Sequence, residues 1–373
     1  MYNFIFITGA GRCGTNIISG LIDGHSKIDV VADEYNNFFG KVLDSNGFGS
    51  NVALEHSGAY LLGSLLHNYK NDDDFHHIKS RLEIRFKEIR KSGISHLSAN
   101  AFLSHICEAL FEKSEGIAVI NICDENIRGL LEAFPGCCII HMIRNPLTQL
   151  NSRYLFRFGD VNSNFTSNFP GSWEFGKAFR KNYNSFRQAS IFNNHSRVLI
   201  LRMEDLQNNT REMVNRVFAF LGEDPEAVNY SPSRRGQIFQ GTRYGRRIST
   251  DKIFADKEDW SCLSPNDLYV CGKIKYVDRF YDLPEFTYAK NSYFYFLRRQ
   301  LGFIGNKRTR TSNTVRIFKV IVVSIAQYLQ DLYEKHYFEK YMKKLDDNMD
   351  SIFRSSSPLD TDKVKRLRKG KGG

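Results

Sequence analysis

The stretch from Phe4 to Leu21, FIFITGAGRCGTNIISGL, constrains the fold of this chain more than any other. It begins with an apolar run of β-branched and aromatic residues, which is typical of a strand buried on both faces. The turn that follows contains Gly9, Gly11 and Gly14, and apolar residues then recur at helical spacing. A strand, a glycine-rich turn and a helix start together aim backbone N–H groups and a helix dipole at one point. The stretch therefore predicts an anion site, most often one for a phosphate.

The glycine turn has the spacing of a P-loop, G-x-x-x-x-G-K-[ST], but lacks its lysine. Gly9 and Gly14 are correctly separated, and Thr15 stands where the lysine belongs. Kinases and NTPases use that lysine on the β- and γ-phosphates and the next hydroxyl on magnesium. Here the positive charge comes earlier, on Arg12. We expect a phosphate-like group held by Arg12 and backbone amides, with no metal ligand in the loop; a tight turn that binds nothing is the alternative.

The composition permits a large α/β domain and suits an anionic ligand. The chain has 373 residues, of which 42% are hydrophobic. Its 52 Lys and Arg against 41 Asp and Glu give a net charge of +11, which fits a polyanionic ligand, nucleic acid or an anionic membrane. Seven irregularly spaced cysteines favour reduced thiols in a cytoplasmic protein over zinc ligands or disulfides. We expect no signal peptide, because the first strand begins at residue 3 or 4. We expect no membrane-spanning helix, because the longest apolar run, 317–329, is short and is broken by Lys319 and Gln327.

Short apolar runs alternate with helical patterns along most of the chain. Strands are predicted at 4–8, 28–32, 117–122, 138–143 and 198–203. Helices are predicted at about 78–91, 99–113, 124–134 (capped by Asp124), 172–192, 210–221 and 265–281, and another begins at Asn145-Pro146. This rhythm predicts a three-layer α/β fold with a central parallel sheet flanked by helices.

A second basic element follows the predicted strand 138–143. Arg144 closes that strand, and Ser152 lies eight residues further on, in the helix that Pro146 opens. Because the carboxyl ends of parallel strands meet at one sheet edge, Arg144 should emerge beside the Arg12 loop. A planar guanidinium with a nearby hydroxyl suits a second phosphate. A strand-end arginine paired with a carboxylate is the simpler alternative, but its coincidence with the first loop favours a phosphate.

These elements resemble the sulfotransferases that use 3′-phosphoadenylyl sulfate (PAPS). The family's 5′-phosphosulfate loop, R-x-G-T-T, is similar to residues 12–16, and its 3′-phosphate site, R-[DN]-P-x(5)-S, is similar to residues 144–152. The block VLILRMEDL at 198–206, with the FLG that ends the next helix, resembles a third family motif. The resemblance covers about residues 3–281. Two departures stand out: Asn16 replaces the second threonine, and residues 120–124 lack the lysine of many relatives.

The resemblance implies metal-independent, in-line transfer of a sulfuryl group from PAPS to a hydroxyl or amine acceptor. The residues implied for PAPS are Arg12, Cys13, Gly14, Thr15 and Asn16 at the 5′-phosphosulfate, and Arg144 with Ser152 at the 3′-phosphate. Arg12 is also expected to act in catalysis, and no residue is expected to bind a metal ion.

The acceptor must lose a proton, and two carboxylates follow the strand predicted at 28–32. Glu34 is the predicted general base, because its strand delivers it to the carboxyl edge beside the loop. Asp33 is the alternative base, and His25 is a third candidate, although a histidine just past a helix is more often a cap or a core partner. A solvated pair of carboxylates with no catalytic role is the simplest reading.

The same resemblance suggests a domain plan. Residues 1–283 would form the sulfotransferase domain, with a helical insertion at 35–115 shaping the acceptor site; 284–354 would form an aromatic and basic helical extension, and 355–373 a disordered basic tail. Aromatic residues near the acceptor segments favour a carbohydrate or glycolipid hydroxyl, with phenolic and other metabolites still open. We expect a cytoplasmic enzyme without a nucleic-acid partner, whose basic C-terminal segment is suited to peripheral membrane contact; the oligomeric state is not predicted.

Two other functions compete with sulfuryl transfer. A P-loop kinase or NTPase would need a lysine near Thr15 and a strand-end aspartate for magnesium, and only Asp124 is available for the second role. A non-enzymatic basic protein that binds nucleic acid or anionic lipid would show steep salt dependence. The sequence contains no helix-turn-helix, zinc-finger or RNP pattern.

Overall fold

The computed structural model describes residues 2–34, 52–53, 75–93, 96–112, 114–122, 126–158, 172–234, 237–238, 263, 268, 271–272, 274 and 276–284. Contacts divide the chain into two units, 1–288 and 289–373, and every described residue lies in the first. The predicted C-terminal extension, apart from residue 284, and the predicted basic tail lie outside the described residues. The predicted domain plan therefore stays a prediction.

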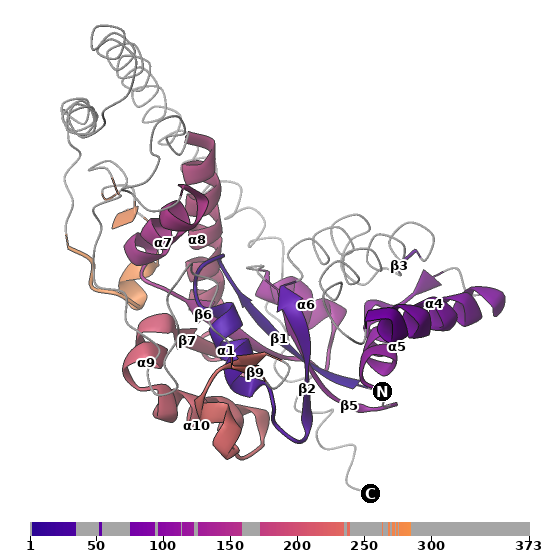
Figure 1. The fold of residues 1–373 in the computed structure, drawn as a ribbon. Helices are drawn as coiled ribbons and strands as arrows, with labels where there is room; N and C mark the ends of the chain where they lie inside the picture. Colours follow the sequence, from indigo (N-terminus) through magenta and orange to yellow (C-terminus); the bar gives the residue numbers. More distant parts are fainter. Residues whose placement is uncertain are drawn as a thin grey trace, which may run out of the picture. The chain divides into compact units, whose positions relative to one another are not determined.

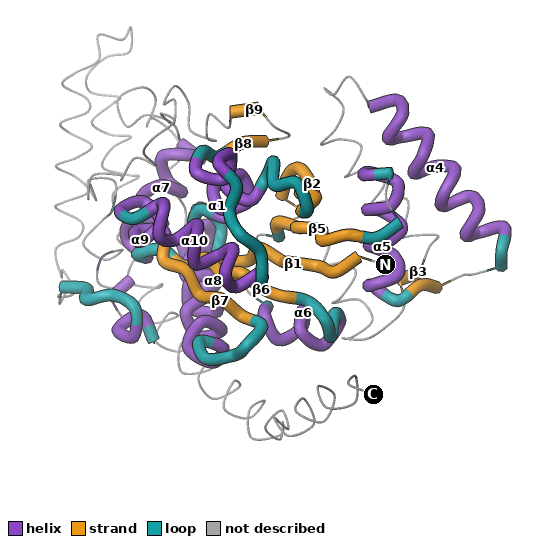
Figure 2. The backbone as a smooth tube through the Cα atoms, turned by 90° about the horizontal axis from the view of Figure 1, so that it is seen from below, coloured by secondary structure: helices purple, strands orange, loops and turns teal. Residues whose placement is uncertain are grey.

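Five parallel strands form the central sheet, in the order β2-β5-β1-β6-β7 (Figure 1). Their bounds are β1 Tyr2–Gly9, β2 Ile28–Glu34, β5 Gly116–Asn121, β6 Cys138–Ile143 and β7 Val198–Arg202. Figure 2 shows the strands side by side in this order. Each strand contains a short apolar run that includes β-branched residues, which is why all five were predictable. The predicted α/β fold with a parallel sheet is confirmed.

Helices cover both faces of the sheet. On one face α1 (Thr15–Ile22), α9 (Met203–Asn208) and α10 (Thr210–Leu221) share a core with Ile5 and Ile7 of β1 (Figure 1). On the other face lie α6 (Ile127–Ala133) and α8 (Ser172–Phe192). There the ring of Phe134 packs 4.8 Å from that of Phe6, and His141 of β6 contacts Ser185 of α8. Alternate residues of the inner strands thus feed two separate cores.

The remaining helices extend this frame. α7 (Pro146–Phe158) follows β6, and α4 (Phe75–Lys91) pairs with α5 (Ala99–Phe111) between β2 and β5 in the chain. In the α4–α5 pair, the ring of Phe86 packs against that of Phe102, with 5.3 Å between the ring centres. Arg85 also forms an ion pair with Glu108. The predicted helices at 78–91, 99–113, 172–192 and 210–221, and the start at Pro146, are all found within a few residues.

Several local predictions were wrong. Asn126, not Asp124, caps α6: its Oδ1 accepts from the N–H of Gly129 at 3.0 Å. The predicted helix 265–281 does not continue to its end, because Tyr276 has a left-handed φ of 70° and Val277–Arg279 form a 3₁₀ turn. The short ladder of β3 (Val52–Ala53) with β4 (His96–Leu97) was missed. So was that of β8 (Ser233–Arg234) with β9 (Gln237–Ile238), in a stretch predicted as loop.

Candidate functional site

The glycine loop joins the central strand β1 to α1. Arg12 lies in the left-handed region with φ 74°, and Gly14, with φ 98°, is the residue from which α1 begins. A Cβ at Gly14 would overlap the Sδ of Met203, and one at Gly9 would overlap the carbonyl oxygen of Met142. Glycine is needed at both positions because the loop lies directly against the end of β6 and the start of α9. The first backbone N–H groups of α1 therefore directly follow a loop whose path is fixed by packing.

The structure brings the two predicted anion elements together. β1 and β6 are hydrogen-bonded neighbours whose register pairs Gly9 with Met142, so their carboxyl ends lie side by side. Arg144, which is 7% exposed, donates from Nη1 to the carbonyl oxygen of Arg12 at 2.9 Å. The guanidinium predicted for one phosphate thus touches the backbone of the loop predicted for the other. Two basic elements from distant parts of the chain therefore lie next to each other at one sheet edge.

Buried amides add a second link between α7 and the glycine loop. Gln149, which is fully buried, donates from Nε2 to the carbonyl oxygen of Gly11. Asn182 of α8 donates in turn to Oε1 of Gln149 at 2.6 Å. Arg153 of α7 lies close by, with Nη1 3.9 Å from the point that a Cβ on Gly11 would occupy. The sequence analysis missed Gln149; its only signal was an amide between the buried leucines of α7.

Glu204 holds the start of α7 in place. Its Oε1 accepts from the backbone N–H of Asn145 at 3.0 Å, and its Oε2 accepts from the hydroxyl of Tyr281 at 2.6 Å. Burial, then the Glu204 carboxylate, raises the pKa of Tyr281 well above its usual value, so the phenol stays a donor. The guanidinium of Arg202 lies 4.7 Å from the centre of the Tyr281 ring. These contacts support a structural role for Glu204.

Three predicted site residues, Ser152, Asp33 and Glu34, lie on α7 and β2. Ser152 lies on α7, two turns beyond its start, and is 4% exposed. β2 continues through Asp33 to Glu34, whereas the sequence predicted that this strand would end at residue 32. Glu34 pairs with Asn121 of β5 after a register shift. The backbone of Glu34 is thus at the carboxyl edge, two strands or about 10 Å from the loop. The side chains of Asp33 and Glu34 lie outside the described part of the structure.

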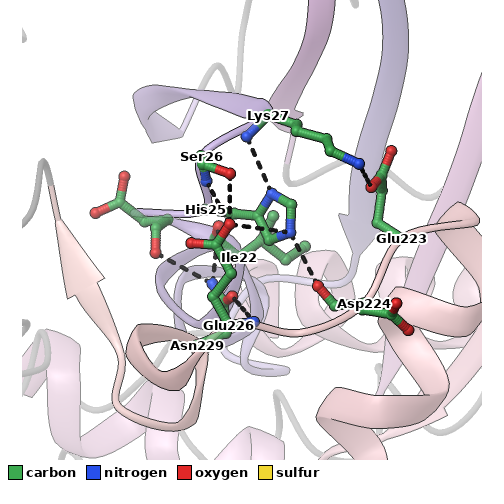
Figure 3. A network of polar contacts seen from close by, with 9 residues as sticks. Ile22, His25, Ser26, Lys27, Glu223, Asp224, Glu226 and Asn229 are labelled. Carbon is green, nitrogen blue, oxygen red and sulfur yellow. Dashed lines mark hydrogen bonds and ion pairs between the residues drawn. The ribbon is translucent and has the colours of Figure 1, made fainter.

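His25 lies at the opposite, amino edge of the sheet, in a cluster of polar side chains (Figure 3). Its Nδ1 accepts from the N–H of Lys27 at 3.2 Å, and its Nε2 donates to the carbonyl oxygen of Asp224 at 3.0 Å. Lys27 also pairs with Glu223 at 2.7 Å. Because His25 precedes β2 while the loops follow their strands, it cannot serve as the general base. It is a structural residue, as histidines past a helix usually are.

The same cluster, which we call the amino-edge cluster, consists of His25, Ser26, Lys27, Glu223, Asp224 and Glu226. The N–H and hydroxyl of Ser26 donate to Glu226 and hold the pKa of that carboxyl below its usual value. Next to it, Asn229 donates to the carbonyls of Ile22 and Asp23 at the end of α1 (Figure 3). The cluster ties the α1–β2 turn to the segment after α10.

Three further observations bear on the predictions. Ile122, where relatives have a lysine nearby, is fully buried and donates its N–H to Ile7 at 2.8 Å, so this position belongs to the core. Among the described residues, no group of three or more His, Cys, Asp or Glu is arranged to hold a metal ion. No helix in the described ranges is long and apolar enough to cross a membrane.

Comparison with known proteins identifies the family. The sequence pattern of the sulfotransferase family matches residues 4–226. The sulfotransferase domain of the Synechococcus PCC 7002 olefin synthase is 17% identical, with a TM-score of 0.47 over 76% of this chain and 96% of that one. The sulfotransferase domain from the curacin biosynthetic pathway is 16% identical, with a TM-score of 0.42 over 76% and 94% of the two chains.

Mouse sulfotransferase SULT7A1, in complex with PAP, is 12% identical, with a TM-score of 0.34 over 82% of this chain and 85% of that one. No curated protein sequence matches the chain. The sequence-pattern match alone carries the assignment, because it spans more than half of the chain and includes both the glycine loop and Arg144. The chain belongs to the sulfotransferase family.

Proposed function

We propose that this protein transfers the sulfuryl group of PAPS to a hydroxyl or amine acceptor. The observation that carries the proposal is the 2.9 Å hydrogen bond from Arg144 to the carbonyl of Arg12, because it joins two basic elements into one site. PAPS has a phosphosulfate at its 5′ end and a separate phosphate at its 3′ position. Two adjacent anion sites at one sheet edge match that charge distribution, whereas ADP-like nucleotides would use only one of them.

The residues fit the donor in chemical terms. The loop offers the start of α1 and the guanidinium of Arg12 to the phosphosulfate. Arg144 carries five N–H donors, so it can hold the loop carbonyl with one and offer others to the 3′-phosphate. Ser152 is the proposed second ligand of that phosphate. The contacts of Gln149 and Glu204 hold the two elements in place and are not needed as ligands.

In the proposed reaction, the acceptor oxygen or nitrogen forms a bond to sulfur as the bond from sulfur to the 5′-phosphate oxygen breaks. Negative charge develops on the leaving phosphate, where Arg12 and the N–H groups of α1 would stabilise it. Glu34 is the proposed acceptor of the proton, with Asp33 as the alternative. Positioning and charge account for this mechanism without a metal ion.

The acceptor, the cellular location and the partners are proposed on sequence grounds alone. Aromatic residues at 154–173 favour a carbohydrate or glycolipid hydroxyl, and the basic C-terminal segment favours peripheral contact with a membrane in the cytoplasm. Most of the segments that would shape the acceptor site, including 35–51, 54–74 and 159–171, lie outside the described residues.

Isothermal titration of the full chain with PAP and with ADP, both without divalent metal, tests the donor assignment. We expect PAP to bind at least tenfold more tightly than ADP, since one additional charge-assisted contact is worth about 1.5–3 kcal/mol. Equal affinities would remove the assignment of Arg144 and Ser152. Magnesium-dependent ATP turnover without PAP binding would instead favour the kinase or NTPase alternative.

A further inference from the structure

We infer that Gln149 is a positioning residue for the proposed reaction, which holds the glycine loop so that Arg12 faces the 5′-phosphosulfate of PAPS. This inference rests on the proposed function and adds to it a residue that touches neither the donor nor the acceptor. The observation that carries it is the hydrogen bond from Nε2 of Gln149 to the carbonyl oxygen of Gly11, the residue directly before Arg12. The two partners are 138 positions apart, and neither family motif specifies either of them.

The backbone carbonyl decides which end of the Gln149 amide faces the loop. A carbonyl oxygen can only accept a hydrogen bond, so the N–H₂ end of Gln149 must be the end that meets Gly11. The amide oxygen of Gln149 then faces α8, where Nδ2 of Asn182 donates to it at 2.6 Å. Both ends of the Gln149 amide therefore have partners, and the orientation of the Asn182 amide follows from that of Gln149.

Arg12 lies between two carbonyls that side chains hold. Gln149 holds the carbonyl before it, and Arg144 donates to the carbonyl of Arg12 itself at 2.9 Å. Arg12 has a φ of 74°, a left-handed conformation that strains a residue with a Cβ and persists only where surrounding contacts hold it. Because peptide units are planar, holding these two carbonyls fixes the peptide planes on both sides of the Arg12 Cα. Those two planes set the direction in which the Arg12 side chain leaves the loop.

Gln149 differs from Arg144 in what else it can do. Arg144 is a proposed ligand of the 3′-phosphate, whereas Gln149 is fully buried and both ends of its amide are engaged within the protein. Its partner Asn182 is also buried, on α8, whose Ser185 contacts His141 of β6. The network therefore links the glycine loop to a helix packed against the sheet, without a contact to the ligand.

Three ligands separate positioning of the loop from support of the whole fold. PAP carries phosphates at both the 5′ and the 3′ positions, ADP carries them only at the 5′ end, and 3′-AMP only at the 3′ position. In full-length Q149L, we expect the dissociation constants of PAP and ADP to rise by about three- to tenfold, a factor typical of one lost hydrogen bond. That of 3′-AMP should change by less than about twofold, because this ligand does not use the loop. Titration calorimetry measures PAP directly, and competition against PAP measures the two weaker ligands.

Asn182 provides a second variant of the same network. N182L leaves Gln149 in place and removes the donor to its amide oxygen, so we expect a smaller loss of about two- to threefold, again confined to PAP and ADP. Q149L/N182L should bind PAP no more weakly than Q149L alone, because Asn182 acts on the loop only through Gln149. If Q149L does not fold, N182L decides alone: a loss confined to PAP and ADP supports the inference, and any other result overturns it.

N229L is the matched control. Asn229 is also fully buried and donates from Nδ2 to backbone carbonyls, those of Ile22 and Asp23, but at the far end of α1. Its replacement should lower the melting temperature and leave all three dissociation constants unchanged. If the wild type fails to bind PAP, the proposed function falls and this inference falls with it. If the wild type binds PAP, the inference alone is overturned by unchanged PAP binding in Q149L, by equal losses of ADP and 3′-AMP, or by an equal loss of PAP binding in N229L.

Discussion

Arg144 donates from Nη1 to the backbone carbonyl of Arg12 at 2.9 Å, so a side chain at the end of β6 holds the loop that follows β1. One guanidinium thus supports the loop and is also the proposed ligand of the 3′-phosphate. Under this proposal, loop geometry and nucleotide recognition depend on the same residue, and the comparison of PAP with ADP below separates the two.

Replacing Arg144 with lysine should weaken PAP binding by about ten- to a hundredfold, or about 1.4–2.8 kcal/mol. Lysine keeps the charge but has no planar fork, so it cannot hold the Arg12 carbonyl and a phosphate together. ADP binding should change less than threefold. Titration calorimetry on R144K and R197K provides the comparison, because Arg197 donates to the carbonyl of Pro135 near the amino edge. Equal losses in the two variants would contradict the role of Arg144.

Replacing Glu34 with glutamine should lower kcat by about 10²–10⁴ and leave the dissociation constant of PAP within twofold. The change removes the proposed proton acceptor and preserves the size of the side chain. D33N should lower kcat by less than tenfold, and a larger loss in D33N than in E34Q would move the base to Asp33. H25Q is the control, because His25 lies at the amino edge and its contacts are structural. Retention of kcat in both carboxylate variants would exclude either one as the base.

Replacing Gln149 with leucine should lower the free energy of unfolding by about 1–3 kcal/mol, since the carbonyl of Gly11 and the amide of Asn182 both lose their partner. Urea unfolding at pH 7 measures this loss. The double variant Q149L/N182L should lose less than the sum of its single variants, because both remove one network. Q188L is the control: Gln188 is half-buried, and its Oε1 accepts a long hydrogen bond of 3.4 Å from the backbone N–H of Arg128. A loss in Q188L as large as in Q149L would show that the Gln149 network has no special weight.

His141 should make the protein less stable as the pH falls from about 6.5 to about 4. Complete burial lowers the pKa of His141 to about 4, from a usual value of 6.5, while its ring contacts Thr8 at 2.7 Å and Ser185 at 2.9 Å. The unfolded chain therefore binds more protons than the native one in this window, and stability rises with pH across it. The full difference is about 3 kcal/mol, reached at the acid end.

Urea unfolding of the wild type and H141N at pH 7, 6 and 5 checks this prediction. The slope of the unfolding free energy against pH should be smaller in H141N, even though the variant is less stable at pH 7. Parallel slopes for the two proteins would mean that His141 does not titrate in this way.

Local patterns were enough to predict the sheet and the two basic elements. The run before Gly9 is apolar and β-branched, and Arg144 directly follows a similar run, so both positions follow from neighbours in sequence. The parallel arrangement then required that the two strand ends share an edge. Each of these steps uses information within about ten residues.

Contacts between distant residues could not be predicted in the same way. The bonds from Gln149 to Gly11 and from Asn121 to Asn16 join positions more than 100 residues apart, and a single sequence carries no signal for such pairs. Near α6 the difficulty was different. Asp and Asn are both favourable N-cap residues, so the sequence does not decide between Asp124 and Asn126 until the first residue of the helix is known. A left-handed tyrosine such as Tyr276 also has no signature in its sequence.

The amino-edge cluster lies at the end of the sheet that carries none of the proposed ligands. The ion pair of Lys27 with Glu223 lies at that end, whereas Arg12 and Arg144 form the proposed PAPS site at the other. Substitutions in the amino-edge cluster are therefore expected to raise or lower the stability of the fold without altering the proposed site at the other end of the strands. Evolution at a different growth temperature can likewise adjust stability at this edge, because such changes need not alter the choice of acceptor.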